Sequence, residues 1–344
     1  MSVLRDISPT LAHANSVSGK VVVITGAANG IGLETARLFA QYGAKIVIGD
    51  ISSKANTAVE GIIKAGGQAI YVPCNVLNWM DVVNLFRRSV STFDAVDIVA
   101  SVIEHGNTCS GAMDRKADQP LPPDITTLEV NLIGTIYTVH AALEYIRHGN
   151  CPPFEKSLIL MGSMAAWGGI PLAPMYTASK YAIHGLMGSI YPVATRDNFR
   201  LACVDPTWTD TELLSLAART VLVGSELIPV SRVAEVILHI ATNPDTTING
   251  CSWLIPDNGP VAVLPVELTC VHAGAYPMIN NRISRVKLCV VLTVVGQQER
   301  TLIKSSGERA LKLVARQLVG LARRVYLGWA LIFALVGVSL YRFI

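Results

Sequence analysis

The feature that most constrains the fold is an alternation, from Lys20 to Val204, of short β-branched runs with longer segments of helical length. The runs are almost continuously apolar, which is typical of strands buried on both faces of a sheet. They read KVVVIT, KIVIG, QAIYVP, DIVASV, SLILMG and FRLACV. Strand, helix and strand repeated in this way predict an α/β fold with a doubly wound parallel sheet, the Rossmann fold, in which ligands bind at the carboxyl ends of the strands.

The helix-length segments and the end of the pattern set the expected domain limits. Helices are expected over Gly30 to Tyr42, Ser52 to Ala65, Asp124 to His148 and Ser231 to Ala241. After a further strand at CSWLI the pattern ends near Gly259. We therefore predict an N-terminal extension over residues 1–19, a Rossmann domain over residues 20–260 and a C-terminal extension over residues 261–324.

Composition indicates a folded protein without a broad nucleic-acid surface. The chain has 344 residues, of which 51% are hydrophobic and 15% are charged, with a formal net charge of +3. This weak charge excess predicts no nucleic-acid partner. The seven cysteines lie far apart, so none forms the paired spacing of a zinc site or a redox dithiol. We expect reduced, mostly buried thiols and no metal site.

The last part of the chain contains a long uncharged apolar run. VYLGWALIFALVGVSLY, residues 325–341, would span about 26 Å as a helix, close to the hydrocarbon thickness of a bilayer. It predicts a terminal transmembrane helix, with a buried terminal hairpin or a helix that pairs two subunits as the alternative. The preceding segment, SSGERALKLVARQLVGLARR, predicts a basic amphipathic helix at a membrane surface, because its leucines and valines fall at helical spacing among cationic residues.

The charges that flank the apolar run predict its orientation. Arg323 and Arg324 precede it, and only residues 342–344 follow it. Because cationic flanks stay on the cytosolic side, we expect a single-pass C-terminal membrane anchor with the preceding domain facing the cytosol. Arg342 at the far end reduces this charge asymmetry.

A glycine-rich loop follows the first predicted strand. TGAANGIG places Gly26, Gly30 and Gly32 at the start of a helix. Glycines there allow the backbone to turn tightly and to approach a pyrophosphate at the positive N-terminus of the helix. A plain turn can have the same spacing, so the position between a strand and a helix is what favours a dinucleotide.

An acidic residue, Asp50, ends the second predicted strand. A carboxylate at this position accepts hydrogen bonds from both ribose hydroxyls of NAD and repels a 2′-phosphate, which favours NAD over NADP. The alternative role of Asp50 is an N-terminal cap for the next helix, because DISS offers several capping side chains.

The segment MYTASKYAIHGL places Tyr176 and Lys180 four residues apart, so that they share one face of a predicted helix. A free tyrosine has a pKa of about 10 and is a poor base at neutral pH. An ammonium one turn away stabilises the phenolate, and a pKa lowered by about two units corresponds to about 2.7 kcal/mol. Tyr176 would then be able to take the proton of an alcohol. An ordinary aromatic residue and a cation on a partly exposed helix are the alternative.

With these motifs the sequence resembles the short-chain dehydrogenase/reductase family over about residues 20–259, and in particular dehydrogenases of fungal natural-product pathways. The positions that match its cofactor loop are Thr25, Gly26, Gly30 and Gly32, and those that match its catalytic set are Ser163, Tyr176, Lys180 and Asn131. The resemblance implies that Tyr176 exchanges the substrate proton while hydride passes to nicotinamide, and that Lys180 holds the nicotinamide ribose hydroxyls. Ser163 would bind the reacting oxygen, and Asn131 would kink its helix and hold a water that links Lys180 to solvent.

The resemblance also implies the cofactor and its contacts. The cofactor is expected to be NAD, with NADP disfavoured by Asp50. The implied cofactor-binding residues are Thr25, Gly26, Asn29, Gly30, Ile31, Gly32, Asp50, Asn75, Val76, Asn131, Tyr176, Lys180, Thr209 and Thr211.

Three positions depart from the family pattern. The turn after the fourth strand, usually Asn-Asn-Ala-Gly, reads SVIEHG over residues 101–106. Asn75 replaces the usual aspartate near the adenine, and Pro206 is followed by Thr207 where the family has glycine. The catalytic set is therefore complete, while the cofactor cradle around it is altered.

The segment ELLSLAARTVLVGSELIPV, which follows Thr211, lies where this family builds its substrate lid. Further apolar side chains nearby are expected from Met164, Trp167, Met175 and Trp208. A hydrophobic lid suits a lipophilic alcohol or ketone, such as a terpenoid, steroid-like, fatty or polyketide-derived molecule. Packing of the lid against its own domain or a second subunit would give the same composition. The helix after the catalytic tyrosine resembles the one by which family members pair, so a homodimer is expected.

We therefore expect an NAD-dependent dehydrogenase that oxidises a secondary hydroxyl of a lipophilic metabolite to a ketone. One alternative is a ketone reductase that uses NADPH, against which Asp50 argues. Another is a membrane-anchored dinucleotide-binding regulator without turnover. The SVIEHG turn is the best support for the regulator, and the complete catalytic set argues against it.

Overall fold

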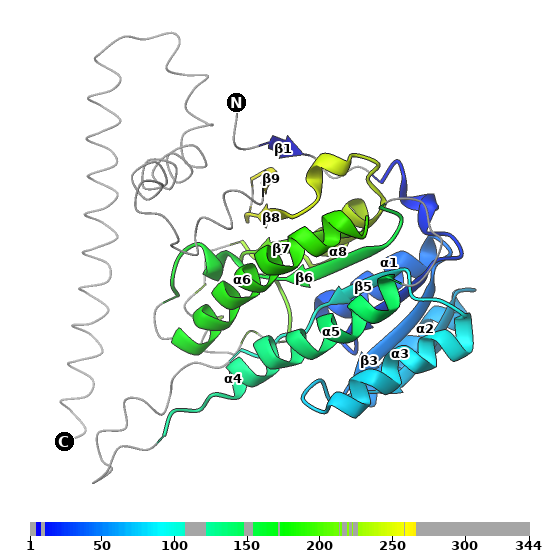
Figure 1. Ribbon diagram of the computed structural model, residues 1–344. Helices are drawn as coiled ribbons and strands as arrows, with labels where there is room; N and C mark the ends of the chain where they lie inside the picture. The colour runs from blue at the N-terminus through cyan, green and yellow to red at the C-terminus, as the bar shows by residue number, and fades with distance from the viewer. Residues whose placement is uncertain are drawn as a thin grey trace, which may run out of the picture. The chain divides into compact units, whose positions relative to one another are not determined.

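The structure is a computed structural model, and it describes residues 5–7, 11–106, 122–147, 154–170, 173–212, 214, 219, 222, 226–257 and 259–265. The described residues form a nine-stranded sheet in the order β1-β9-β8-β7-β6-β5-β2-β3-β4 (Figure 1). The strands are β1 (Arg5–Ile7), β2 (Val21–Thr25), β3 (Lys45–Asp50), β4 (Gln68–Pro73), β5 (Ile98–Ser101), β6 (Ser157–Met161), β7 (Arg200–Pro206), β8 (Cys251–Ile255) and β9 (Val261–Leu264). The helices are η1 (Ala14–Val17), α1 (Gly30–Gln41), α2 (Lys54–Lys64), α3 (Trp79–Phe93), α4 (Thr126–Leu128), η3 (Glu129–Ile133), α5 (Gly134–Arg147), η4 (Met164–Ala166), α6 (Pro174–Arg196), α8 (Val230–Thr242) and η5 (Thr246–Ile248).

The central strands of the sheet are parallel, from β4 through β3, β2, β5, β6 and β7 to β8. The order of the strands along the chain reverses between β2 and β5, which pair from Val22 with Ile98 to Thr25 with Ser101. In an open sheet of this kind, ligands bind outside the carboxyl ends of the strands at such a reversal. The predicted doubly wound parallel sheet is therefore confirmed.

The sheet is wider than the sequence predicted. β9 (Val261–Leu264) pairs antiparallel with β8, and β1 (Arg5–Ile7) pairs antiparallel with β9. Residues on both sides of the predicted limits, 20 and 260, therefore belong to the sheet. The reason is that the segments before and after the alternating pattern pair with each other at its edge.

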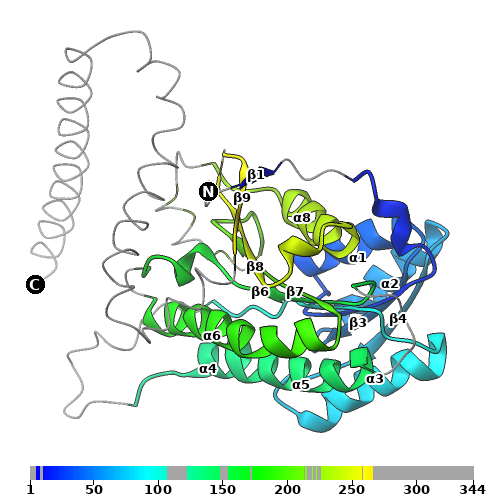
Figure 2. The ribbon, with the colours of Figure 1, turned by 45° about the horizontal axis from the view of Figure 1, so that its top comes forward.

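Helices cover both faces of the sheet, as the two views of Figures 1 and 2 show. Val22 and Ile24 of β2 are buried in the core formed with α1, α2 and α8. Val21 and Val23, which point to the other face, are buried in the core formed with α3, α5 and α6. Each such side chain contributes about 1.5–3 kcal/mol by burial, which explains why the central strands have no polar alternation.

The helix expected over Asp124 to His148 is interrupted. It begins as α4 (Thr126–Leu128), continues as the π-helical segment η3 (Glu129–Ile133) and goes on as α5 (Gly134–Arg147). Asn131 lies in η3, so the irregular turn falls where the resemblance implies a kink.

Several predictions concern residues outside the described ranges. They are the terminal span over residues 325–341, the basic helix before it and most of the lid. In the ranges that are described, no helix combines the length and the apolar character needed to cross a bilayer. Three cysteines lie within these ranges, Cys74, Cys203 and Cys251, and all three are buried thiols outside any disulfide, as expected.

Candidate active site

The glycine-rich loop between β2 and α1 packs closely against its surroundings. Gly26 has a φ of +76°, and a Cβ atom there would lie 2.6 Å from the carbonyl oxygen of Val102. A Cβ atom on Gly32 would lie 2.2 Å from the carbonyl oxygen of Gly26. Both positions therefore require glycine. Asn29 and Gly30 at the N-terminus of α1 are not buried. The backbone N–H groups there can bind an anion such as a pyrophosphate, as a dinucleotide site requires.

The far side of the loop faces the segment that follows β7. The methyl group of Thr211 lies 3.3 Å from where a Cβ on Gly30 would stand. A cavity of about 320 Å³ opens beside these two residues, and it is also bordered by Leu33, Arg37, Arg219 and Val230. Thr209 is buried and forms a β-bridge with Ile228. The structure therefore brings Thr211 to the glycine loop, where the resemblance implies cofactor contacts, whereas the described contacts of Thr209 are with Thr207 and Ile228. Asn29 and Ile31 belong to the loop and its helix.

Asp50, at the end of β3, joins the glycine loop to the start of the next helix. Its Oδ2 accepts a hydrogen bond from the backbone N of Ala28 at 2.9 Å, and its Oδ1 accepts one from the backbone N of Ser52 at 2.8 Å. The second bond closes a turn before α2 and is not the capping role that the sequence left open, because the N-cap residue of α2 is Ser53 and has no side-chain cap bond. A carboxylate has about four acceptor positions, so these two bonds leave room for ribose hydroxyls.

Asn75 and Val76 follow β4 at the same end of the sheet. Asn75 is exposed, its Oδ1 accepts a hydrogen bond from the backbone N of Leu77, and its own backbone N donates to Asp81. Val76 packs against Gly134, where a Cβ would lie 2.6 Å from its Cγ2. Thr25, which ends β2, is buried beside Ser101, and the buried hydroxyls of both lack a hydrogen-bond partner among the described residues.

The predicted catalytic side chains Ser163, Tyr176 and Lys180 come from two elements, η4 and α6. Ser163 caps η4 (Met164–Ala166), its Oγ accepting a hydrogen bond from the backbone N of Ala165 at 3.1 Å. Tyr176 and Lys180 lie one turn apart on α6, with Nζ of Lys180 5.3 Å from the centre of the tyrosine ring. Nζ of Lys180 also donates to the carbonyl oxygen of Met161 at 3.2 Å. The structure therefore brings Ser163, Tyr176 and Lys180 together at the carboxyl end of β6.

A carboxylate that the sequence reasoning did not include, Glu104, occupies the centre of this group. The hydroxyl of Tyr176 donates a hydrogen bond to Oε1 of Glu104. The same oxygen lies 3.5 Å from Nζ of Lys180. Glu104 comes from the SVIEHG turn, which follows β5 where the family usually has small residues. The sequence signal that could have indicated this contact was the presence of an acidic residue in the SVIEHG turn.

The electrostatics of Tyr176 differ from what the sequence predicted. Burial, followed by the negative charge and the hydrogen bond of Glu104, raises the pKa of Tyr176 well above its ordinary value. A hydrogen bond with Ser163 acts in the opposite direction but is a smaller cause. The expectation that Lys180 would lower this pKa is therefore wrong for the structure described. The reason is that burial disfavours the charged phenolate, and that Glu104 also pairs with the ammonium and places an anion beside the phenol.

Asn131 fixes the turn that carries Glu104. Its Oδ1 accepts a hydrogen bond from the backbone N of His105 at 2.7 Å, and its Nδ2 donates to the carbonyl oxygen of His105 at 3.0 Å. Nδ2 also donates to Oγ of Ser179, which donates to the carbonyl oxygen of Tyr176. Asn131 is thus buried between the turn and α6, and its position fits a structural link between the two.

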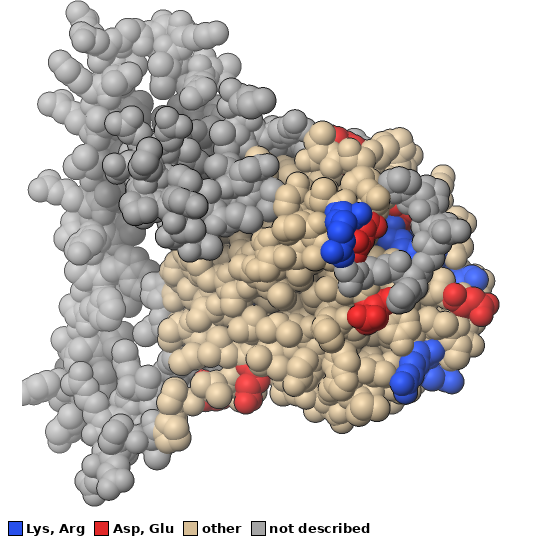
Figure 3. All heavy atoms as spheres, viewed as in Figure 1, with Lys and Arg blue, Asp and Glu red and all other residues tan. Residues whose placement is uncertain are grey.

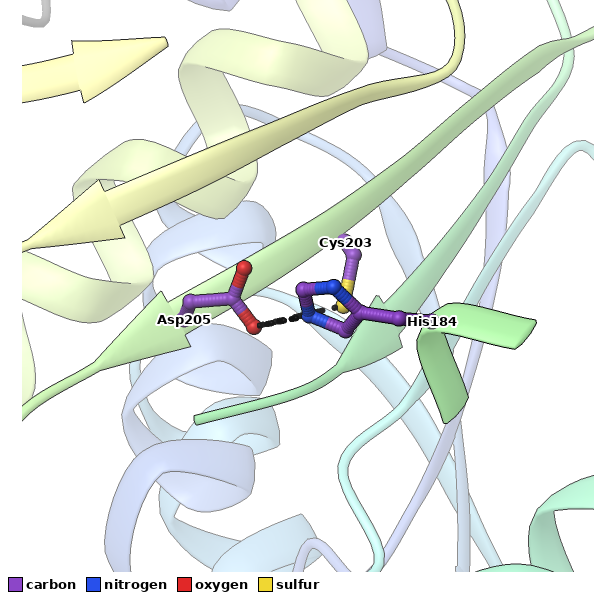
Figure 4. A group of neighbouring side chains, drawn as sticks. All are labelled: His184, Cys203 and Asp205. Carbon is purple, nitrogen blue, oxygen red and sulfur yellow. Dashed lines mark hydrogen bonds and ion pairs between the residues drawn. The ribbon is translucent and has the colours of Figure 1, made fainter. Parts of the chain in front are cut away.

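Beyond Lys180 lies a second group of buried polar side chains, His184, Cys203 and Asp205 (Figure 4). Nε2 of His184 and Sγ of Cys203 lie 2.9 Å and 3.5 Å from Oδ1 of Asp205, and Nε1 of Trp167 donates to Oδ2. Burial and Asp205 raise the pKa of the Cys203 thiol well above its ordinary value. The donor atoms of the three lie within 4.8 Å of one another, a grouping that the separate sequence positions did not reveal. Hydrogen bonding to the buried Asp205 carboxylate accounts for this arrangement.

This site and fold agree with what the comparisons with known proteins show. A family model described as short chain dehydrogenase matches residues 20–220. The chain therefore belongs to the short-chain dehydrogenase family. It is by class an NAD(P)-dependent alcohol dehydrogenase or reductase.

Its relatives include a dehydrogenase and a reductase-like protein. A 5′-hydroxyaverantin dehydrogenase of Emericella nidulans is 32% identical over 217 residues, which cover 58% of this chain and 70% of that protein. A tropinone reductase-like protein 1 of Erythroxylum coca is 30% identical over 275 residues, which cover 78% of this chain and 94% of that protein. A solved short chain dehydrogenase from Burkholderia cenocepacia, in complex with NADP, has a TM-score of 0.61 and 24% identity and covers 70% of this chain and 98% of that one. This last likeness shows the fold.

Proposed function

We propose that the protein is an NAD-dependent dehydrogenase that oxidises a secondary hydroxyl of a lipophilic metabolite, of terpenoid, steroid-like or polyketide-derived type, to a ketone in a secondary-metabolite pathway. The observation that carries this proposal is the grouping of Ser163, Tyr176 and Lys180 at the carboxyl end of β6. The relative that acts on 5′-hydroxyaverantin supports the substrate class.

The described residues fit a dinucleotide. The backbone around Gly26 and Gly32 has no room for a Cβ, and α1 presents its N-terminus to a pyrophosphate. Asp50 would hold the adenosine ribose, and Lys180 the nicotinamide ribose. When bound, the nicotinamide supplies the hydride acceptor. Ser163 and Tyr176 would hold the alcohol oxygen, and Tyr176 would move its proton.

The preference for NAD rests on the charge of Asp50. A 2′-phosphate would meet the carboxylate that already binds Ala28 and Ser52. Titration of the full-length protein in mild detergent, followed by tryptophan fluorescence, should show NADH binding more tightly than NADPH. Asp50→Asn keeps the size of the side chain and should narrow the difference. Tighter binding of NADPH by the unaltered protein would contradict the proposed cofactor and favour the ketone reductase.

A second candidate function is a dinucleotide-binding regulator without turnover. The contact of Glu104 with both Tyr176 and Lys180 favours the regulator. The Glu104 carboxylate binds the hydroxyl and the ammonium that the reaction needs for the substrate and the cofactor. The test is production of NADH from NAD with borneol and testosterone as probe alcohols, with Tyr176→Phe as the blank. Turnover above the blank would exclude the regulator, whereas dinucleotide binding without turnover would favour it.

We also propose that two copies pair through α5 (Gly134–Arg147) and α6 (Pro174–Arg196). The exposed positions of α6 before its last residue include Tyr181, Gly185, Ser189 and Pro192, none of them charged. Figure 3 shows this side of the molecule as largely uncharged over its middle. Light scattering after gel filtration should give twice the mass of the chain. Ser189→Arg should give the single mass, and a single mass without the substitution would contradict the pairing.

Membrane attachment through residues 325–341, with the domain on the cytosolic side, is likewise a proposal that the apolar run and its cationic flank support. The full-length protein mixed with phosphatidylcholine vesicles should float with them in a density gradient. The same protein with Leu331, Leu335 and Leu340 replaced by aspartate should stay at the bottom. Equal flotation of the two proteins would contradict the anchor.

A further inference from the structure

We propose that Glu104 is the group that accepts the proton passed on by Tyr176 during alcohol oxidation, so that the two side chains form a proton relay. This inference rests on the proposed function, since it deepens the chemistry of that same site. It assigns a chemical role to a residue of the turn that departs from the family pattern.

The geometry places Glu104 at the end of a path from the substrate position to solvent. The Tyr176 hydroxyl donates to Oε1 of Glu104, so its proton already points at the carboxylate. The Glu104 side chain is 19% exposed, whereas that of Lys180 is 1% exposed. A proton that reaches Glu104 can therefore pass to water, which a proton held near Lys180 could do only through a further carrier.

The turn is built to hold the carboxylate in this position. Asn131 bonds both the N–H and the carbonyl oxygen of His105, the residue after Glu104. The ring Nδ1 of His105 lies 3.2 Å from Oγ1 of Thr127, which ties the same turn to α4. Lys180 attracts the carboxylate from 3.5 Å on the other side. Three separate contacts thus orient a residue that the fold itself does not require.

Tyr176 needs such a partner. A phenol that keeps its proton cannot accept a second one, so a protonated Tyr176 acts as a base only if its own proton leaves at the same time. Burial and Glu104 favour this protonated form, since they raise the pKa of Tyr176. The arrangement therefore exchanges the phenolate base implied by the resemblance for a hydrogen-bonded pair in which the carboxylate is the final base.

The step balances without any further reagent than the proposed function supplies. The substrate O–H bond breaks as a new bond forms between its proton and Oη of Tyr176. The former Tyr176 proton moves to Oε1 of Glu104. The alcohol carbon is oxidised to a carbonyl, and its hydride reduces an oxidised nicotinamide dinucleotide. Glu104 then releases the proton to water.

The charged and titratable groups around the pair come from several elements. Tyr176 and Lys180 lie on α6, Asp205 at the end of β7 also acts on Tyr176, and His105 is the neighbour of Glu104 in the turn. The pH profile of one enzyme therefore cannot be assigned to a single group, and the profiles of the variants must be compared with one another.

The test compares Glu104→Gln with Glu104→Asp in the full-length enzyme. Glutamine keeps the shape but accepts no proton, so kcat for borneol oxidation should fall by about 100-fold to 10,000-fold and lose its dependence on pH at the acid side. Aspartate should restore part of kcat, because it restores the base. Glu60→Gln on α2 removes an exposed carboxylate far along the chain and should leave kcat unchanged.

A second measurement needs no cofactor. The near-ultraviolet absorbance of phenolate, followed against pH with Tyr176→Phe as the blank, reports the ionisation of Tyr176. In Glu104→Gln this ionisation should move to lower pH, since an anion beside the phenol is gone. An unchanged titration would overturn the relay, as would a Glu104→Gln enzyme with equal or faster turnover, in which Glu104 merely obstructs the cofactor. If the unaltered enzyme shows no turnover, the proposed function fails. If the unaltered enzyme turns over and Glu104→Gln is as fast, only the relay fails, so the two failures are distinguishable.

Discussion

Asn131 binds the backbone of His105 through both ends of its amide, accepting from the N–H at 2.7 Å and donating to the carbonyl oxygen at 3.0 Å. The amide thus acts on a turn of the chain 26 residues away in sequence. Because both bonds are partly buried, their loss leaves backbone groups of His105 without these partners in a region with limited access to water.

Asn131→Ala should therefore destabilise the fold by about 1–3 kcal/mol, the cost of leaving partly buried backbone groups of His105 without their partners. Urea unfolding followed by circular dichroism measures this. Asn56→Ala is the matched control, since its exposed amide bonds only Ser53 of its own helix start, and it should cost less than about 0.5 kcal/mol. Equal urea midpoints for the two variants would show that the hydrogen bonds between Asn131 and His105 do not contribute to stability.

Gly32→Ala should abolish dinucleotide binding and lower stability by about 1–3 kcal/mol, because the new methyl group would lie 2.2 Å from the carbonyl oxygen of Gly26 and backbone would have to move. Titration with NADH and urea unfolding measure the two effects. Gly61→Ala offers the comparison, since nothing stands within 4 Å of its Cβ position on α2, and it should raise stability by up to about 1 kcal/mol. Similar behaviour of both alanine variants would contradict the close packing of the loop.

The alternating pattern of the sequence was enough to predict the parallel core of the fold. Strands such as β2 and β3 are buried on both faces, and that burial leaves a continuous apolar run. The edge was not predictable in the same way. β1 consists of Arg5, Asp6 and Ile7, and so short and charged a segment has no periodicity. It is a strand because β9, more than 250 residues further along the chain, lies beside it.

The shared helix face of Tyr176 and Lys180 could be predicted from the sequence, but the electrostatics around them could not. Spacing alone places Tyr176 and Lys180 on one helix face, and the structure agrees. A spacing rule says nothing about a side chain that arrives from elsewhere. Burial, followed by the charge and hydrogen bond of Glu104, raises the pKa of Tyr176 instead of lowering it, and both causes arise from distant segments that meet only in the tertiary structure.

Cys74 should react slowly with iodoacetamide in the folded protein. Burial, followed by the charges of Asp81 and Asp50, raises the pKa of its thiol to about 12. A raised pKa means less thiolate at any lower pH, so at pH about 8 the rate should be about 1,000-fold below that of an ordinary thiol and should rise about tenfold per pH unit up to the pKa. Mass spectrometry of the Cys74 peptide from native and urea-unfolded protein gives both rates. Equal rates would show that the thiol is accessible and unperturbed.

Arg200 should be one of the most sensitive positions for stability outside the active site. Its side chain is buried at the start of β7, and it donates hydrogen bonds to the carbonyl oxygens of Ile240 and Ala241, each at 2.9 Å, and of Asn243. These carbonyls belong to the C-terminal end of α8, where a cation also offsets the negative end of the helix dipole.

Arg200→Met would leave these carbonyls unpaired in the interior and should lower the free energy of unfolding by about 2–4 kcal/mol. Arg200→Lys keeps the charge, but one ammonium cannot reach all the acceptors. Its free energy of unfolding should therefore be lowered by less than that of Arg200→Met. Arg88→Met, on the exposed face of α3, should change the free energy by less than about 0.5 kcal/mol. Urea unfolding of the three variants ranks them, and an Arg200→Met protein as stable as Arg88→Met would mean that water replaces the guanidinium at the end of α8.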